Sequence, residues 1–244
     1  MSQTEQLKEQ ILSQNPTAQQ KDAIFADELE FLLRASPGSG KTWTSCRRFI
    51  WRGANWHHKV GGLALLSFTN TAIREFHEAT IKVGRRELLS NPNYVGTFDS
   101  FVERFVITPF GHLINGSAKR PKLFLAPRPG DWKNKKLQGW TEVSGGQKRP
   151  VPAWAIIPFP DNGKVAFRAS SRFGGKTLTF QWGNPVAEFF RLGYYTHAQR
   201  VYLACRILFD RPHIAHCLAR RFPEIIVDEA QDTNIWLLIL LNLL

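Results

Sequence analysis

The sequence is poor in cysteine, and its three cysteines are far apart. Cys46, Cys205 and Cys217 form no C-x-x-C pair and no even set that would build a disulfide framework. Long apolar runs are also missing, because the most hydrophobic stretch, residues 235–244, is about half of the roughly 20 residues that cross a bilayer. These absences exclude a disulfide-rich secreted scaffold and a membrane span, and they indicate a reduced, cytoplasmic setting with no membrane partner.

Acidic residues are scarce, and no export signal is predicted. Residues 1–14 are polar and carry charges of both signs, unlike a signal peptide. There are 20 Asp and Glu against 32 Lys and Arg, a net charge of +12, and residues 119–176 alone hold 13 basic and 3 acidic side chains. A cluster of basic groups gains free energy by releasing counterions from phosphate backbones, so the sequence favours a polyanionic partner.

Apolar runs and helical patterns alternate along the first part of the chain. The chain of 244 residues with 18 Phe and 8 Trp can bury one large core or two smaller ones. Buried strands are predicted at 29–35, 62–68, 94–98 and 224–227, and helices at 16–28, 41–52, 71–83 and 98–106. This alternation predicts an α/β fold, with a parallel sheet that helices cover on both faces.

The composition changes between residues 108 and 221, where Pro, Gly, Lys and Trp are frequent. Short β-type runs occupy 154–180, and helical patterns return over 185–221. We expect an inserted, mainly helical basic subdomain at 108–221, with the sheet domain divided into 1–107 and 222–244. Its basic residues are interleaved with Phe124, Trp132, Trp140 and Trp154. Such a mixture can contact phosphates and stack on bases, although a solvated basic surface over buried Trp remains the alternative.

A phosphate-binding loop is predicted at residues 35–42, which read ASPGSGKT, with Ala35 in place of the first glycine of the pattern. Glycines let backbone N–H groups close around a phosphate, and the helix that follows directs its positive end at the anion. Lys41 is expected to neutralise phosphate oxygens, and Thr42 to offer its hydroxyl to Mg²⁺. The alternative is a chance glycine-rich turn. The expected nucleotide-binding residues are Ala35, Ser36, Pro37, Gly38, Ser39, Gly40, Lys41 and Thr42.

Two adjacent carboxylates follow the last predicted strand. Open α/β sheets bind ligands at this edge, so Asp228 is the expected Mg²⁺ ligand and Glu229 is expected to orient or deprotonate the attacking water. Gln231 would report the phosphate state to neighbouring elements. A solvated acidic loop is the alternative, but its pairing with the loop at Lys41 favours the two halves of one ATP site.

Four segments, in order, resemble the UvrD, Rep and PcrA type of superfamily 1 helicases. They read NPTAQQ at 15–20, SFTNTA at 67–72, GTFDSF at 96–101 and DEAQDT at 228–233. The last segment matches the family pattern without change. In the others, Ser67 and Thr71 replace Thr and Lys, and Asp99 replaces His.

The resemblance implies residue roles beyond the phosphate loop. Gln20 stands where the family reads the adenine edge. Single-stranded DNA contacts are implied for Phe68, Thr69, Asn70, Thr97 and Phe98. Stacking on an aromatic ring suits a motor that grips any sequence, because every base has a π-face. Phe68 as a plain core residue is the alternative.

The implied protein is an ATP-dependent DNA helicase or translocase that uses ATP and Mg²⁺ on single-stranded DNA or a junction of single and double strands. By analogy with the family it moves 3′ to 5′ and acts in DNA repair, recombination or replication. The fold implied is RecA-like, as in P-loop NTPases. A second RecA-like domain, which supplies arginines worth about 10³ to 10⁵ in rate in such reactions, is expected to be absent or to come from a partner chain.

Two other functions remain open from the sequence. One is a truncated, catalytically inactive protein that holds DNA through residues 119–176. The other is one subunit of a nuclease-linked or phage-defence helicase complex. A metal site at His213, His216 and Cys217 is disfavoured because the ligand set is incomplete.

Overall fold

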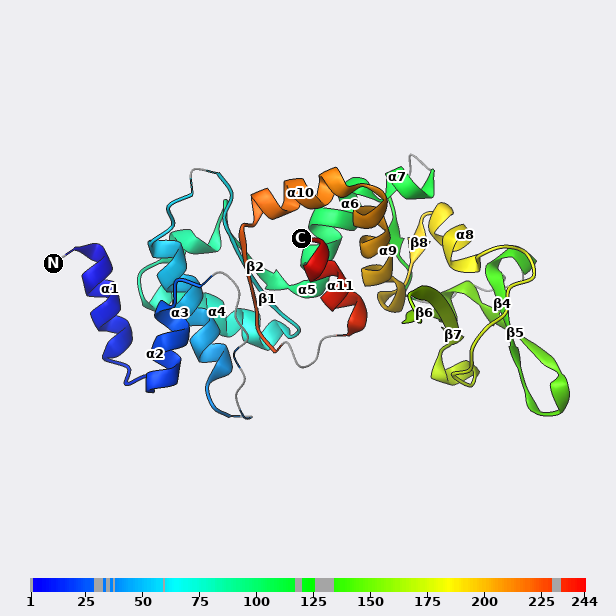
Figure 1. Ribbon diagram of the computed structural model, residues 1–244, viewed down its shortest axis with the longest axis horizontal. Coiled ribbons are helices and arrows are strands. Elements are labelled where there is room, and N and C mark those ends of the chain that lie inside the picture. Colours follow the sequence, from blue (N-terminus) through cyan, green and yellow to red (C-terminus); the bar gives the residue numbers. More distant parts are fainter. Residues whose placement is uncertain are drawn as a thin grey trace. The chain divides into compact units, whose positions relative to one another are not determined.

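The computed structural model describes residues 2–28, 33, 36, 38–58, 60–116, 120–125, 134–229 and 234–244 (Figure 1). The chain divides into two compact units. Unit 1 comprises Met1–Phe101 and His216–Thr233, and unit 2 comprises Val102–Ala215 and Asn234–Leu244. Three predicted site residues, Ala35, Pro37 and Gln231, lie outside the described residues, as does the strand predicted at 29–35 apart from Leu33.

Unit 1 is built on a three-stranded parallel sheet in the order β2-β1-β9. These strands are β1 (Leu63–Ser67), β2 (Tyr94–Thr97) and β9 (Glu224–Val227). Every residue of β1 is buried, which agrees with the continuous apolar run in the sequence, since a central parallel strand is covered on both faces. The predicted α/β fold with a parallel sheet is confirmed for this unit.

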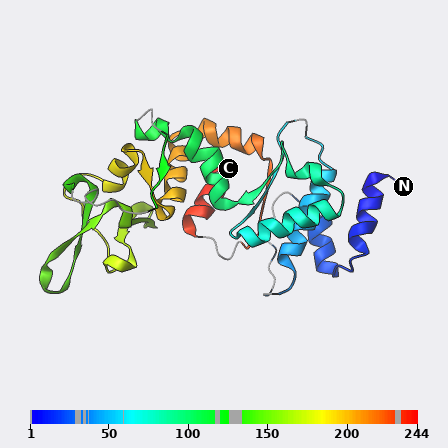
Figure 2. The same cartoon turned by 180° about the vertical axis from the view of Figure 1, so that it is seen from behind.

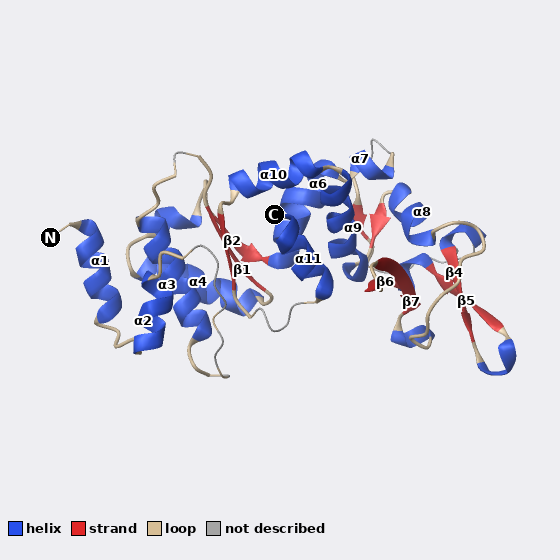
Figure 3. Ribbon diagram, viewed as in Figure 1, coloured by secondary structure: helices blue, strands red, loops and turns tan. Residues whose placement is uncertain are grey.

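Helices pack on this sheet through a shared apolar cluster. Phe49 and Ile50 of α3 meet Leu63 and Leu65 of β1 and Phe76 of α4 in that cluster. Side-chain caps start α2 and α4, where the hydroxyls of Thr17 and Thr69 accept backbone N–H groups. The helices of unit 1 are α1 (Gln3–Leu12), α2 (Ala18–Phe25), α3 (Lys41–Ala54) and α4 (Asn70–Lys82) (Figure 3). Two further helices, α5 (Phe98–Val102) and α10 (Pro212–Arg221), have residues in both units.

A buried ion-pair network joins α3 to β9. The carboxylate of Glu224 lies 2.7 Å from Nε of Arg52 and 3.5 Å from Nε of Arg48. Arg48 also donates to the carbonyl oxygens of Ala23, in α2, and Ala26, directly after it, at 3.0 Å each. Burial lowers the pKa of Arg48, and the charge of Glu224 opposes that shift. The network therefore ties the helix after the phosphate loop to the strand that carries Asp228.

Unit 2 contains the remaining helices. The bounds are α6 (Thr108–Phe110), α7 (His112–Asn115), α8 (Pro185–Arg191), α9 (His197–Asp210) and α11 (Ile235–Leu243), with a π-helical stretch at Glu103–Ile107. Both ribbon views show α11, in red, beside α9 (Figures 1 and 2). Trp236 of α11 donates from Nε1 to the carbonyl of Pro158 at 2.9 Å. The helix packs in unit 2, whereas the sequence grouped residues 222–244 with the sheet domain.

Residues 138–169 form two β-hairpins, and the second, at 156–169, lies within the β-type runs predicted at 154–180. The strands of unit 2 are β3 (Lys122–Leu123), β4 (Gln138–Glu142), β5 (Lys148–Pro152), β6 (Ile156–Asp161), β7 (Lys164–Ala169) and β8 (Tyr194–Tyr195). Asn162 and Gly163 both have positive φ, of 46° and 74°, and form the turn between β6 and β7. An Asn-Gly pair is a strong hairpin signal, because both central positions of the turn need positive φ.

Short 3₁₀ turns connect these elements at Arg86–Leu89, Lys135–Leu137, Ser144–Gly146, Ala153–Ala155 and Ser171–Phe173. Within the described part of the chain, no helix is both long enough and apolar enough to cross a membrane.

Candidate functional site

The described part of the phosphate loop adopts a backbone that requires glycine. Gly38 and Gly40 have φ of 77° and 81°, in the left-handed region that side chains rarely adopt. A Cβ on Gly40 would also lie 2.9 Å from Nε2 of Gln20. The N–H of Ser39 donates to the carbonyl of Ser36 at 3.2 Å, which closes a tight turn before α3. The two glycines of the predicted motif are therefore needed for this conformation.

Lys41 is the first residue of α3, at the positive end of a helix of 14 residues. Its ammonium donates to the carbonyl oxygen of Ser36 at 3.0 Å, so it is held over the loop. The first turn of α3 carries no acidic side chain that would neutralise this end. The loop backbone, the helix end and the ammonium together suit an anion.

Thr42 and Asp228 are 186 residues apart in sequence and meet in space. The hydroxyl of Thr42 donates to Oδ2 of Asp228 at 2.9 Å. Asp228 is only 2% exposed, and its backbone N–H donates to the carbonyl of Leu66 at 2.8 Å, which continues the pairing of β9 with β1. The fold therefore places the predicted carboxylate against the helix that follows the phosphate loop.

Ser45 is a member of this cluster that we did not predict from sequence. Its hydroxyl donates to Oδ1 of Asp228 at 3.3 Å, so each carboxylate oxygen accepts from one hydroxyl of α3. Residues three apart lie on the same face of a helix, so the spacing of Thr42 and Ser45 was the available signal.

The oxygen donors of Thr42 and Asp228 fit Mg²⁺, a hard cation that proteins commonly hold with one or two carboxylates together with substrate phosphates. Among the described residues, no group of three or more His, Cys, Asp or Glu could hold a metal ion by itself.

Glu229 leaves β9 in a left-handed backbone conformation, with φ of 58°. A non-glycine residue in this region costs about 1–2 kcal/mol, and such residues cluster at functional sites. Gln231, the third predicted residue of this segment, lies outside the described residues.

Gln20 joins the start of α2 to the phosphate loop. Its Oε1 accepts the N–H of Thr17 at 2.9 Å, and its Nε2 donates to the carbonyl of Ser39 at 3.1 Å. The residue that the resemblance assigns to adenine is therefore in direct contact with the loop assigned to the phosphates.

The residues with implied DNA contacts lie where β1 and β2 end, on neighbouring strands. The rings of Phe68 and Phe98 are stacked, with centroids 6.2 Å apart and planes at 20°. Phe98 is 3% exposed, so it supports the partly buried Phe68 rather than offering its own face to a base. Thr69 uses its hydroxyl to cap α4, and Thr97 accepts the N–H of Ser100 at 3.2 Å. Asn70, at the start of α4, is exposed.

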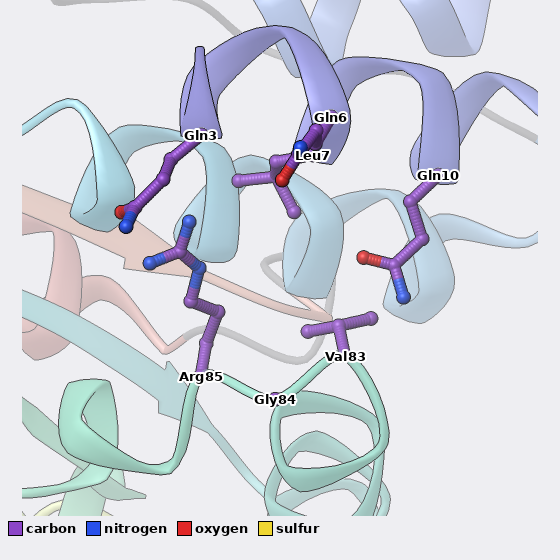
Figure 4. Close-up of a pocket in the computed structure, with 7 residues that line it drawn as sticks. All are labelled: Gln3, Gln6, Leu7, Gln10, Val83, Gly84 and Arg85. Carbon is purple, nitrogen blue, oxygen red and sulfur yellow. The ribbon is translucent and has the colours of Figure 1, made fainter. Parts of the chain in front are cut away.

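A separate pocket lies between α1 and the turn after α4 (Figure 4). It is lined by Gln3, Gln6, Leu7, Gln10, Val83, Gly84 and Arg85. Amides and one guanidinium dominate its polar groups, and its lining includes no carboxylate or nucleophile. No predicted site residue lines this pocket, so it is distinct from the candidate nucleotide site.

Burial controls the chemistry of the cysteine next to this cluster. Cys46 follows Ser45 on α3, and burial raises the pKa of its thiol to about 11, although the charge of Arg47 opposes the shift. A protonated, buried thiol is a poor nucleophile, so we assign Cys46 to the core.

Comparison with known proteins finds sequence similarity to DNA helicases. A sequence model described as the UvrD/REP helicase N-terminal domain matches residues 16–135. The proteins named DNA helicase II of Salmonella typhimurium (strain LT2) and Escherichia coli (strain K12) are each 25% identical to the chain over 229 residues. The match covers 88% of the chain and 30% of the length of each relative. The chain therefore spans less than a third of the relatives that it matches.

Proposed function

The chain belongs to the UvrD/REP helicase family, and on that premise we propose that it forms the ATP-binding portion of an ATP-dependent DNA helicase or translocase. The observation that supports this most directly is the contact between Thr42 and Asp228 beside the glycine loop. That contact joins two segments at opposite ends of the sequence into one phosphate-side cluster. The ligands proposed for it are ATP and Mg²⁺.

In this proposal the chain's own residues bind and orient the nucleotide. The N–H groups around Gly38 and Gly40 and the ammonium of Lys41 would hold phosphate oxygens, for which the ammonium would leave the carbonyl of Ser36. Thr42 and Asp228 would hold Mg²⁺, whose chemistry here is to offset charge on the phosphates. Glu229 would orient the attacking water and accept its proton. Gln20 would face the adenine while it contacts Ser39.

Single-stranded DNA is the proposed second ligand of unit 1, at the ends of β1 and β2. Phe68 would stack on a base, and Phe98 would hold Phe68 in place through their stacked rings. Asn70 and the backbone around Thr69 and Thr97 would contact the strand. Movement from 3′ to 5′, and a role in repair, recombination or replication, follow as proposals from the family.

Efficient hydrolysis and unwinding are proposed for a longer assembly, because the chain covers 30% of the length of its relatives. An arginine supplied to the phosphates is worth about 10³ to 10⁵ in rate in comparable reactions. A second RecA-like domain, in the same polypeptide or in a partner chain, would supply it.

The test is nucleotide binding by the chain itself. We expect a fluorescent ATP analogue to bind in the presence of Mg²⁺, and Lys41→Ala to weaken that binding at least about tenfold, because charge-assisted hydrogen bonds contribute about 1.5–3 kcal/mol. Lys82→Ala, an exposed lysine on α4 away from the loop, is the matched control. Equal binding by the parent chain and both variants, or no binding at all, would contradict the proposal.

A further inference from the structure

The two hairpins of unit 2 are joined into one small β platform, which we define as residues 134–182. The segment after β7 pairs with both hairpins. Thr179 exchanges two backbone hydrogen bonds with Trp140 of β4, at 2.9 and 3.0 Å, and Leu178 donates to Phe167 of β7 at 2.9 Å. The two hairpins therefore do not move as independent arms, because one strand segment is bonded to each.

Close packing under β4 fixes the position of Trp140. A Cβ on Gly139 would lie 3.2–3.3 Å from side-chain atoms of Ile156, Phe180 and Leu178, so the strand lies directly on these apolar groups. Neighbouring residues of a strand point to opposite faces, so Trp140 faces away from this packing. The platform thus holds an aromatic ring on the face opposite its core.

The platform carries an unbalanced positive charge. It contains eight Lys or Arg and two Asp or Glu, and all eight cationic residues are exposed. Two exposed arginines elsewhere in unit 2 have carboxylate partners, in the pairs Arg191–Glu188 and Arg206–Asp210. Within the described part of the chain, no ion pair involves a cation of the platform. This charge is available to an anionic ligand.

Aromatic rings lie among these cations. Trp182 is 48% exposed, its ring centroid lies 6.5 Å from that of Trp140, and Nζ of Lys135 lies 5.7 Å from its centroid. Arg149 likewise lies 5.4 Å from the ring centroid of Phe173. Because the ring of Trp182 is half exposed and lies beside Lys135, a base could stack on the ring while the lysine contacts a neighbouring phosphate.

We propose that the platform binds single-stranded nucleic acid, with a base stacked on Trp182 and phosphates held by Lys135 and its cationic neighbours. Aromatic stacking together with phosphate contacts is the chemistry that recognises unpaired strands. In a duplex the base faces are already stacked on one another, so a half-exposed indole selects the unpaired form. This site goes beyond the proposed function, because it needs neither ATP nor the residues at the ends of β1 and β2.

The test measures fluorescence anisotropy of a labelled 15-mer of deoxythymidine on the whole chain without nucleotide. We expect Trp182→Ala to weaken binding about 5- to 100-fold, the range found for loss of one stacked base, and Trp182→Phe to stay within about 3-fold of the parent chain. Lys135→Gln should reduce the slope of log affinity against log salt by about 0.7, the value for one phosphate contact on a single strand. A uridine 15-mer, titrated in parallel, shows whether DNA or RNA is preferred.

Two matched controls lie outside the platform. Phe209→Ala removes a ring of α9 that is 74% exposed, and Lys82→Gln removes one exposed charge of α4; neither should change the affinity or the salt slope. Unchanged binding of both 15-mers by a folded Trp182→Ala chain would overturn the proposal. So would a 15-bp duplex that binds as tightly as the single strand with the same sensitivity to Trp182→Ala. If Trp182→Ala does not fold, the salt slope of Lys135→Gln and the affinity of Trp182→Phe still test the proposal. Loss of ATP binding in Lys41→Ala bears on the nucleotide site alone.

Discussion

The hydroxyl of Ser45 donates to Oδ1 of Asp228 at 3.3 Å, one helical turn beyond the contact that Thr42 makes with the other carboxylate oxygen. Two hydroxyls of one helix therefore fix the orientation of a buried carboxylate. The pair assigns Ser45 a positioning role at the proposed Mg²⁺ site.

Replacing Ser45 tests this role. Ser45→Ala should raise the Mg²⁺ concentration at half-maximal ATP binding about 2- to 10-fold, because one hydrogen bond contributes about 0.5–1.5 kcal/mol. Ser45→Thr keeps the hydroxyl and should restore the parent value, which a purely structural role would not require. The measurement is a Mg²⁺ titration at fixed ATP analogue. An identical Mg²⁺ dependence in Ser45→Ala and the parent chain would remove the assignment.

Gly40→Ala should abolish nucleotide binding and lower the free energy of unfolding by about 1–2 kcal/mol, the cost of a left-handed backbone at a residue with a Cβ. The added Cβ would also press on Gln20, 2.9 Å from its Nε2. Gly84→Ala is the control, because Gly84 has φ of 75° and no atom within 4 Å of an added Cβ. Both variants should lose stability in urea unfolding, but only Gly40→Ala should lose ATP. Full ATP binding by Gly40→Ala would show that the loop tolerates a different conformation.

Glu224→Ala should lower the free energy of unfolding by about 3–5 kcal/mol, because it leaves buried guanidinium charge without its carboxylate. The affected partners are Arg48 and Arg52, at 3.5 and 2.7 Å. Asp27→Ala serves as the comparison, since Asp27 is a fully exposed partner of Arg52 at 3.9 Å. Its removal should leave stability almost unchanged, as for surface ion pairs. Equal losses in the two variants would show that burial of the network contributes little.

The three thiols should react at different rates. Burial raises the pKa of Cys46 to about 11 and that of Cys205 to about 12, whereas Cys217 is exposed. At pH 8 we expect an aromatic disulfide reagent to modify one thiol per folded chain rapidly and all three only in denaturant. Cys217→Ser should abolish the rapid phase, and survival of that phase would refute the assignment.

The same shifts set a pH dependence of stability. The ordinary pKa of 9.0 applies to Cys46 in the unfolded chain, and the folded value is higher. The stabilisation from its protonated thiol is therefore complete below pH 9 and is lost as the pH rises towards about 11. Cys46→Ala should make the free energy of unfolding, measured by chemical denaturation, fall less steeply between pH 9 and pH 11. An unchanged dependence on pH would mean that Cys46 does not contribute to it.

Much of unit 1 could be predicted from the sequence because its signals are local. Strands β1, β2 and β9 coincide with short apolar runs, and the turn before α3 follows from Gly38 and Gly40. That Thr42 and Asp228 lie close together was predictable, because loops at the carboxyl ends of neighbouring parallel strands lie at the same edge of a sheet. The contact itself was not predicted. The roles of these residues remain predictions.

The features that sequence reasoning missed depend on tertiary contacts. Ser45 belongs to no motif, and its three-residue spacing from Thr42 gained meaning only from the contact with Asp228. The stacking of Phe98 against Phe68 decides which ring can face a base, and periodicity does not encode that choice. The apolar helix α11 buries Trp236, Leu237 and Leu240, but hydrophobicity alone does not say which partner covers it. The β-type runs predicted at 154–180 include the hairpin that turns at Asn162 and Gly163, but its strand pairing was not predicted.

The sheet order β2-β1-β9 also determines when the candidate nucleotide site can assemble during synthesis. β1 ends at Ser67, yet its second partner begins at Glu224, so that edge of the sheet stays unpaired while more than a hundred residues are translated. Contacts between residues so distant in sequence close large loops and form slowly. The exposed edge of β1 is meanwhile a template for wrong pairing. The carboxylate of Asp228 can therefore contact Thr42 only after β9 has left the ribosome. Until then the cluster of Thr42, Ser45 and Asp228 is incomplete.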